Sequence, residues 1–187
     1  MASSSGVSIP IRAVRTTTAN QPPVRRLAED AIQTFLAGTP VKVYTTTGGV
    51  IAWPGDGGSA VTDAIAGFSQ EDASYLTTLG VPKTLSFGTV PNQPAAVNIP
   101  RGAPLNDGKV GVELASEEVV FRGQVGTTAA ATDIGKSYGL TVDTDLHWYV
   151  DKAKTTTTVA VRVVGIDPND SRGVYFVVLP AARQMLA

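Results

Sequence analysis

Apolar and polar positions alternate in short runs from about residue 40 to the end of the sequence. In residues 159–163 the valines alternate with other residues, so that one face is hydrophobic and Arg162 falls on the other; the whole predicted strand covers residues 159–166. Residues 174–179 are almost entirely apolar, which is typical of a central strand covered on both faces. Together with residues 147–150, these two segments are the clearest predicted strands.

Shorter segments with the same pattern are separated by glycine, proline and other turn residues. They predict strands at residues 41–44, 50–53, 64–68, 84–87, 95–99, 110–114 and 119–121. One helical turn is expected to start at Thr132 and to end at Gly139. About ten short strands with so little helix indicate a mainly β protein, with a small β-barrel or β-sandwich body and one or two short helices.

A helical pattern occurs only before this region. Leu27, Ala31 and Phe35 are spaced four residues apart, and Gly38 with Pro40 would end a helix. The spacing predicts a short amphipathic helix over residues 25–35. It would pack either on the body of the same chain or on a partner.

The first 26 residues contain four charged side chains, all of them arginines, and the first acidic residue is Glu29. This segment is rich in serine and threonine and has few large apolar residues, so it has little surface to bury in a core of its own. We expect an extended arm, which either orders on an acidic partner surface or has no role. The predicted division is an arm with its short helix at residues 1–36 and a β-rich body at residues 37–187.

Composition excludes several kinds of chemistry. The chain of 187 residues has no cysteine and one histidine, which excludes disulfides, cysteine-based metal sites, thiol catalysis and multi-histidine metal sites. Its formal net charge of −1 argues against a nucleic-acid-binding protein, and no aromatic residues are interleaved with the arginines of the arm. No apolar run is long enough to span a membrane, and the start of the sequence lacks the pattern of a secretory signal, so we expect synthesis in a cytoplasm.

The remaining motifs are better explained by turns than by catalysis. Residues 135–139 match the G-x-S-x-G pattern around Ser137, but the strand–helix alternation of a hydrolase is missing. Asp143, Asp145 and Asp151 flank a hairpin-like segment without the twelve-residue pattern of a calcium loop. We therefore predict no catalytic, cofactor-binding or metal-binding residues, and no enzyme activity.

Several segments of the body resemble those of the capsid decoration (cement) proteins of tailed bacteriophages. These are residues 99–112, 119–125, 133–140, 147–151, 162–168 and 172–179. The resemblance implies a β-rich body on the outer surface of an icosahedral head. There it would bind the major capsid protein and neighbouring copies of itself, often as a homotrimer, without catalysing a reaction.

Under this hypothesis the arm binds the capsid. Its candidate contact residues are Arg12, Arg15, Arg25, Arg26, Leu27, Ile32 and Phe35. The alternative hypothesis is a carbohydrate- or receptor-binding β module, such as the base of a head fibre. It rests on Trp148 and on the loop that follows Trp53, which we expect to be exposed.

Overall fold

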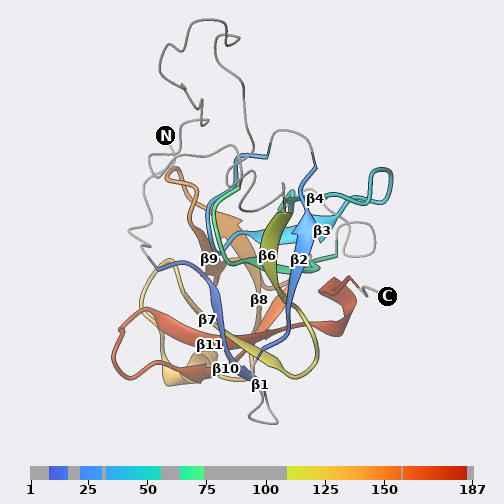
Figure 1. The fold of residues 1–187 in the computed structure, drawn as a ribbon. Coiled ribbons are helices and arrows are strands. Elements are labelled where there is room, and N and C mark those ends of the chain that lie inside the picture. The colour runs from blue at the N-terminus through green and yellow to red at the C-terminus, as the bar shows by residue number, and fades with distance from the viewer. Residues whose placement is uncertain are drawn as a thin grey trace, which may run out of the picture.

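The chain forms two antiparallel β-sheets in a computed structural model that describes residues 9–16, 22–30, 33–55, 64–73, 109–156 and 158–184 (Figure 1). The six-stranded sheet has the order β1 (Arg12–Thr16), β7 (Val119–Gln124), β11 (Gly173–Val178), β10 (Val161–Ile166), β8 (Ser137–Val142) and β9 (Trp148–Asp151). The five-stranded sheet has the order β2 (Val24–Ala28), β6 (Lys109–Leu114), β5 (Gly67–Ser69), β3 (Pro40–Val43) and β4 (Val50–Ala52). The sheets do not close into a barrel, so the predicted mainly β class is confirmed in its sandwich-like form.

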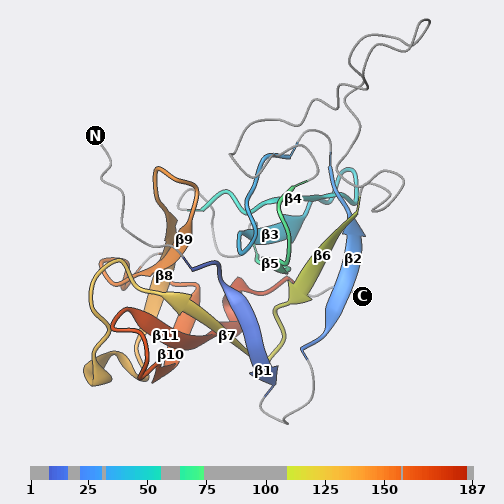
Figure 2. The same cartoon turned by 60° about the vertical axis from the view of Figure 1, so that its left-hand side comes forward.

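The chain passes between the two sheets at two points. β1 belongs to the six-stranded sheet, β2 to β6 build the five-stranded sheet, and β7 to β11 return to the six-stranded sheet. The second crossing is made by the short turn of residues 115–118 between β6 and β7. Figure 2 shows the two groups of strands side by side, with β1 close to the five-stranded sheet.

The main hydrophobic core contains side chains from both sheets. Phe68 of β5 is fully buried, and its ring centroid lies 4.6 Å from that of Phe121 on β7 and 6.0 Å from that of Phe176 on β11. On β10 the predicted alternation is confirmed, because Val161 and Val163 are buried while Arg162 is exposed. The aromatic cluster therefore joins the sheets across the sandwich.

A second cluster lies within the five-stranded sheet and the chain that precedes it. Its buried members are Phe35, Val41, Val50, Ala73, Val110 and Val112. The residues before β3 thus contribute directly to the core of the body.

The predicted amphipathic helix over residues 25–35 is wrong. Val24–Ala28 is β2, and all five of its residues pair with β6. Leu27 and Phe35 both reach the second cluster, but they do so from an extended chain. Inter-strand hydrogen bonds and burial against β6 outweigh the local helical spacing, as tertiary contacts commonly do.

The described parts of the predicted arm also belong to the sheets. β1 pairs with β7, and Ile11, just before it, is fully buried in the main core. β2 extends the five-stranded sheet beside β6. Residues 1–8 and 17–21 lie outside the described residues. Residues 9–16 and 22–28 are therefore not a free extended segment, because β1 pairs with β7, β2 pairs with β6 and Ile11 is buried in the main core.

Two further differences concern residues 130–142. The helical turn is the 3₁₀-helix η1 (Ala131–Asp133), which follows Ala130 rather than Thr132. Gly139 lies inside β8, a strand that the sequence pattern did not predict, where Tyr138 and Leu140 are buried in the main core.

Most of the other predicted strands have counterparts, although residues 84–87 and 95–99 lie outside the described residues. A second 3₁₀-helix, η2 (Pro180–Ala182), follows β11. Across the described residues, none of the helices has the length and apolar character needed to cross a membrane.

Candidate functional site: two N-terminal strands and an aromatic pocket

The two arginines of β1 have different surroundings. Arg12 is half-buried, and its Nη1 donates a hydrogen bond of 2.9 Å to the main-chain oxygen of Ser69 on β5. Arg15 is exposed and forms no ion pair with any residue in the described part of the chain. Arg12 therefore joins the two sheets, whereas Arg15 presents its charge to solvent.

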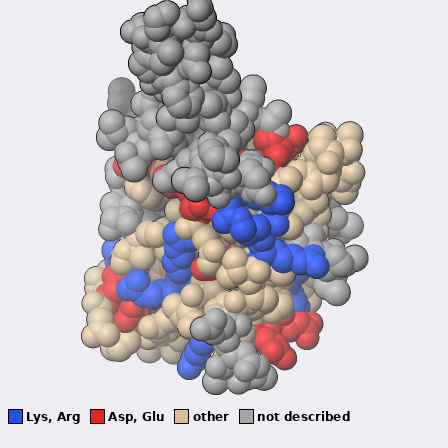
Figure 3. Space-filling view, in the orientation of Figure 1, with Lys and Arg blue, Asp and Glu red and all other residues tan. Residues whose placement is uncertain are grey.

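β2 is an edge strand with an exposed, basic surface. Val24, Arg25 and Arg26 are exposed, and among the described strands β2 pairs only with β6. Arg26 forms an ion pair of 3.4 Å with Glu71 and donates a hydrogen bond of 2.9 Å to the main-chain oxygen of Lys109. Figure 3 shows basic side chains over the region where Figure 1 draws β2 and β6.

The main-chain groups along the outer edge of β2 are arranged for pairing with another strand. The amide of Leu114 donates to the main-chain oxygen of Pro23, and residue pairs in an antiparallel ladder alternate between hydrogen-bonded and non-bonded. This alternation directs the amides of Val24, Arg26 and Ala28 away from β6. β2 thus combines outward-facing donors with arginine side chains.

Two of the three apolar candidate residues lie in the body. Leu27 is half-buried against the second cluster, and Phe35 is 5% exposed within it. Ile32 lies outside the described residues. Of the seven candidate contact residues, Arg15, Arg25 and Arg26 present exposed side chains. Figures 1 and 2 both place the end of β1 next to the start of β2, so Arg15 and Arg25 lie toward the same end of the molecule.

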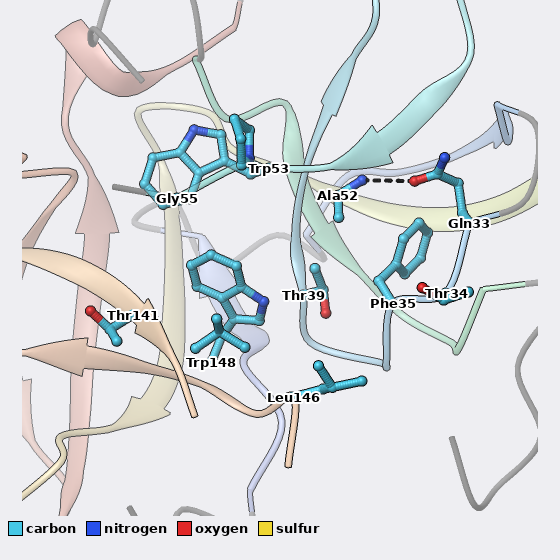
Figure 4. Close-up of a pocket in the computed structure, with 12 residues that line it drawn as sticks. Gln33, Thr34, Phe35, Thr39, Ala52, Trp53, Gly55, Thr141, Leu146 and Trp148 are labelled. Atoms are coloured by element: carbon cyan, nitrogen blue, oxygen red, sulfur yellow. Dashed lines mark hydrogen bonds between the residues drawn. The ribbon is translucent and has the colours of Figure 1, made fainter. Parts of the chain in front are cut away.

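A pocket of about 490 Å³ opens between β4, the segment before β3 and the β8–β9 hairpin (Figure 4). Its lining residues are Gln33, Thr34, Phe35, Thr39, Ala52, Trp53, Pro54, Gly55, Thr141, Val142, Leu146 and Trp148. The rings of Trp53 and Trp148 have their centroids 5.6 Å apart and are tilted by 50°. Trp53 is 7% exposed because it packs against Trp148 and into the main core. Of the loop after it, which was predicted to be exposed, Pro54 is exposed and Gly55 is buried, and residues 56–59 lie outside the described residues.

The rim of this pocket is shaped by the turn between β8 and β9. Leu146 has a φ of 66° and is the only non-glycine residue with a positive φ in the described part of the chain. The carboxylate of Asp143 holds the turn, because its Oδ1 accepts hydrogen bonds from the amides of Asp145 and His147 at 2.9 Å each. The sequence pattern gave no sign of Leu146, since an aspartate-rich turn usually places glycine or asparagine in this conformation.

The same turn gathers Asp143, Asp145 and His147, whose potential ligand atoms lie within 4.8 Å of one another. Asp143 is engaged by the two main-chain amides of the turn, and Asp145 is exposed. These contacts are those of an Asx-type turn. They account for the positions of the acidic residues without a ligand.

Ser137 does not lie on a nucleophile elbow. It is the first residue of β8, and Gly135 before it has a φ of +87° in the turn that leads from η1 into that strand. A nucleophile elbow requires a strand before the serine and a helix after it. The G-x-S-x-G match is thus a turn followed by a strand.

A buried polar cluster fixes the turn before β8. Asp133 accepts hydrogen bonds from Tyr138 Oη at 2.8 Å, from Lys152 Nζ at 2.9 Å and from the amide of Ala130 at 2.9 Å. Burial by itself raises the pKa of Asp133, but the hydrogen bonds from Lys152, Ala130 and Tyr138 outweigh it and hold that pKa below its ordinary value. Burial, followed by the hydrogen bond to Asp133, raises the pKa of Tyr138 to about 12.

Comparisons of this chain with models of protein families, with curated proteins and with solved structures find no match. The fold and the surfaces described above therefore carry the functional argument.

Proposed function

We propose that this chain is a structural virion protein that binds the outer surface of a phage major capsid protein lattice and cements neighbouring capsomers. The resemblance of its body segments to cement proteins suggests this role. The observation that carries the proposal is the outer edge of β2, which combines outward-facing amides with the exposed side chains of Arg25 and Arg26.

Such an edge binds a partner in two complementary ways. An extended capsid segment that pairs with β2 would satisfy the outward-facing amides of Val24, Arg26 and Ala28, as in other cases of β-strand addition. Exposed arginines beside the added strand would meet acidic capsid side chains and make binding sensitive to salt. Since a lattice repeats its sites, a modest affinity per copy gives firm attachment when copies are linked.

The proposal includes association between copies of the chain. A homotrimer at a three-fold position of the lattice would present three β2 edges to three capsid subunits. Arg15, which lies toward the same end of the molecule as the start of β2, would extend the basic surface toward the neighbouring subunit.

The charge contribution is tested by co-sedimentation of the purified chain with empty capsid shells built from the major capsid protein of the same virus. We expect saturable binding that weakens as salt is raised, and a loss of roughly tenfold or more in affinity for the double variant Arg15→Glu/Arg25→Glu. Arg162→Glu, at an exposed arginine on β10, is the matched control and should bind as the unaltered chain does. Absence of binding to the shells, or equal binding by the double variant and the control, would refute the proposal.

Strand addition is tested separately with Arg26→Pro and Arg26→Ala. Both variants lose the same charge, but only proline removes the amide that faces the open edge, and an edge strand tolerates proline at such a position. We expect Arg26→Pro to bind shells more weakly than Arg26→Ala, with both variants folded by circular dichroism. Equal binding by the two variants would show that β2 pairs with no capsid strand.

A further inference from the structure

The pocket between Trp53 and Trp148 has a lining that is suited to a small neutral ligand with both apolar and hydroxyl-bearing faces. We infer that it is a binding site for a neutral saccharide. This inference goes beyond the proposed capsid role and does not depend on it. A volume of about 490 Å³ lies within the range of typical ligand pockets, roughly 300–1,000 Å³.

The charge of the lining defines the ligand class. None of the twelve lining residues is Lys, Arg, Asp, Glu or His. A phosphate, sulfate or carboxylate group would lose its hydration in this pocket without gaining an opposite charge, which is unfavourable. The described lining therefore favours an uncharged ligand.

The lining also combines two kinds of surface. Phe35, Trp53 and Trp148 provide aromatic surface from three separate segments, and the hydroxyl-bearing Thr34 and Thr39 lie on the same side of the pocket as Phe35 (Figure 4). A pyranose ring has C–H groups that pack against apolar side chains and hydroxyls that exchange hydrogen bonds with polar ones. Pockets of this kind typically place a few polar groups among apolar walls.

Existing hydrogen bonds hold several of these groups in place. The hydroxyl of Thr141 donates to Oδ2 of Asp151 at 3.0 Å, which fixes this side chain at the pocket wall. Oε1 of Gln33 accepts from the amide of Ala52 at 3.2 Å, which orients the side-chain amide at the pocket wall. Both tryptophans are more than nine-tenths buried, so their rings are fixed before any ligand arrives.

Two backbone features keep the pocket in this shape. Leu146 is 43% exposed and adopts the left-handed conformation, which is unfavourable for a leucine. Gly55 has a φ of +77°, and a Cβ there would lie 3.2 Å from Cη2 of Trp148. A strained apolar residue at the rim of a pocket indicates a binding role, because strain of this kind concentrates at ligand-binding sites.

The tryptophans supply a direct assay. They are the only two in the sequence and both line the pocket, so tryptophan fluorescence reports on this site alone. Maltose, cellobiose and lactose are titrated into the full chain, with glucose 6-phosphate and sialyllactose as charged counterparts. We expect a saturable change in emission with at least one neutral sugar and none with the charged ones.

The decisive variant is Leu146→Gly. Glycine relieves the left-handed conformation, so the melting temperature should be retained, whereas loss of the leucine side chain should weaken saccharide binding by roughly tenfold. Val164→Thr, at a valine of β10 that is 41% exposed and outside the pocket, is the control and should bind normally. The inference is overturned if no neutral sugar changes the emission, if the charged sugars bind equally well, or if Leu146→Gly binds like the unaltered chain.

Discussion

The side chain of Glu113 on β6 accepts a hydrogen bond from the main-chain amide of Ala13 on β1, with 2.5 Å between Oε2 and the nitrogen. These residues belong to different sheets and lie 100 positions apart in the sequence. Oε1 of the same carboxylate is 3.4 Å from Nε2 of Gln70, and Arg12 makes a second link to Ser69. The edge of β1 that faces away from β7 is therefore taken up at Ala13 by the five-stranded sheet. Among the described strands, β2 pairs on one side only, with β6.

Replacing Glu113 by alanine should destabilise this link. Glu113 is 7% exposed, so its loss leaves the amide of Ala13 without an acceptor in a poorly solvated position, at a cost of about 1–3 kcal/mol. Urea denaturation measures the free energy of unfolding, and hydrogen exchange at Ala13 measures the local effect. Glu113→Gln retains a side-chain acceptor and should cost less. Unchanged exchange at Ala13 in the alanine variant would contradict this role for the carboxylate.

Truncation of Phe68 should have the largest effect on stability. Its ring is fully buried between Phe121 and Phe176, and Phe68→Ala leaves a cavity where the two sheets meet. Substitutions of this type cost about 3–5 kcal/mol in the free energy of unfolding. Val164→Ala, at an exposed position of β10, should stay within about 0.5 kcal/mol of the unaltered chain. A loss at Phe68 no larger than that of the control would show that the aromatic cluster does not join the sheets.

The free energy of unfolding should fall in acid because two aspartates in the loop between β10 and β11, Asp167 and Asp170, have lowered pKa values. The hydrogen bond from the amide of Asn169, followed by that from Arg122 at 2.6 Å, lowers the pKa of Asp167 below its ordinary value of 3.8. The pKa of Asp170 is also lowered, first by the amide of Arg172 and then by Gln124. Since the unfolded chain takes up these protons at higher pH than the folded chain, the stabilisation is full above about pH 5 and is lost as pH falls through 3.8 and below.

Asp167→Asn tests this assignment. The variant should be less stable at neutral pH and should show a flatter acid limb in a plot of unfolding free energy against pH. Asp145→Asn, at an exposed carboxylate, is the control for loss of one acidic side chain and should leave stability at neutral pH unchanged. If the acid limbs of Asp167→Asn and the unaltered chain run parallel, Asp167 makes no pH-dependent contribution.

Tyr138 should produce a second loss of stability in alkali. Its pKa is raised to about 12 in the folded chain from an ordinary value of 10.0, first by burial and then by the hydrogen bond to Asp133. The unfolded chain therefore releases this proton at lower pH than the folded chain. The contribution is fully present below pH 10.0 and is lost as pH rises toward 12.

Tyr138→Phe should remove this alkaline step while lowering stability at neutral pH, because Asp133 loses one hydrogen-bond donor. Unfolding free energies measured between pH 9 and pH 12 by urea denaturation would detect the step as a downward slope. A slope of equal size in the phenylalanine variant would assign the alkaline transition to another group.

The sequence best predicted the strands in which the pattern of apolar residues matches the pattern of buried positions. On β10 the alternation of valine with other residues matches the alternation of buried and exposed positions, and the apolar run of residues 174–179 corresponds to β11, third in a six-stranded sheet. β8 was missed because Gly139 interrupts its pattern. Its position in the sheet is set by pairing with β9 and β10, which no local pattern encodes.

The prediction of an arm and a helix in the N-terminal segment was wrong for the same reason, because pairing with distant strands decides its structure. Four arginines without an acid resemble a solvated arm, and the four-residue spacing of Leu27, Ala31 and Phe35 resembles a helix. However, β1 pairs with β7 and β2 with β6, and both partner strands come from residues far along the chain. Of the residues that line the pocket, the sequence suggested a ligand-binding role only for Trp148 and the loop that begins at Trp53. The burial of the two tryptophans against each other, the place of Phe35 beside them and the conformation of Leu146 arise where separate segments meet.

The amino-acid sequence by itself determined the mainly β class, the absence of cysteine chemistry and the faces of the strongest strands, because composition and two-residue periodicity are local properties. Only the tertiary structure decided that Ala13 meets Glu113, that β2 pairs with β6 alone among the described strands and that two tryptophans line one pocket. Those relationships depend on which distant strands pair, and pairing is selected by the burial and hydrogen bonding of the whole chain.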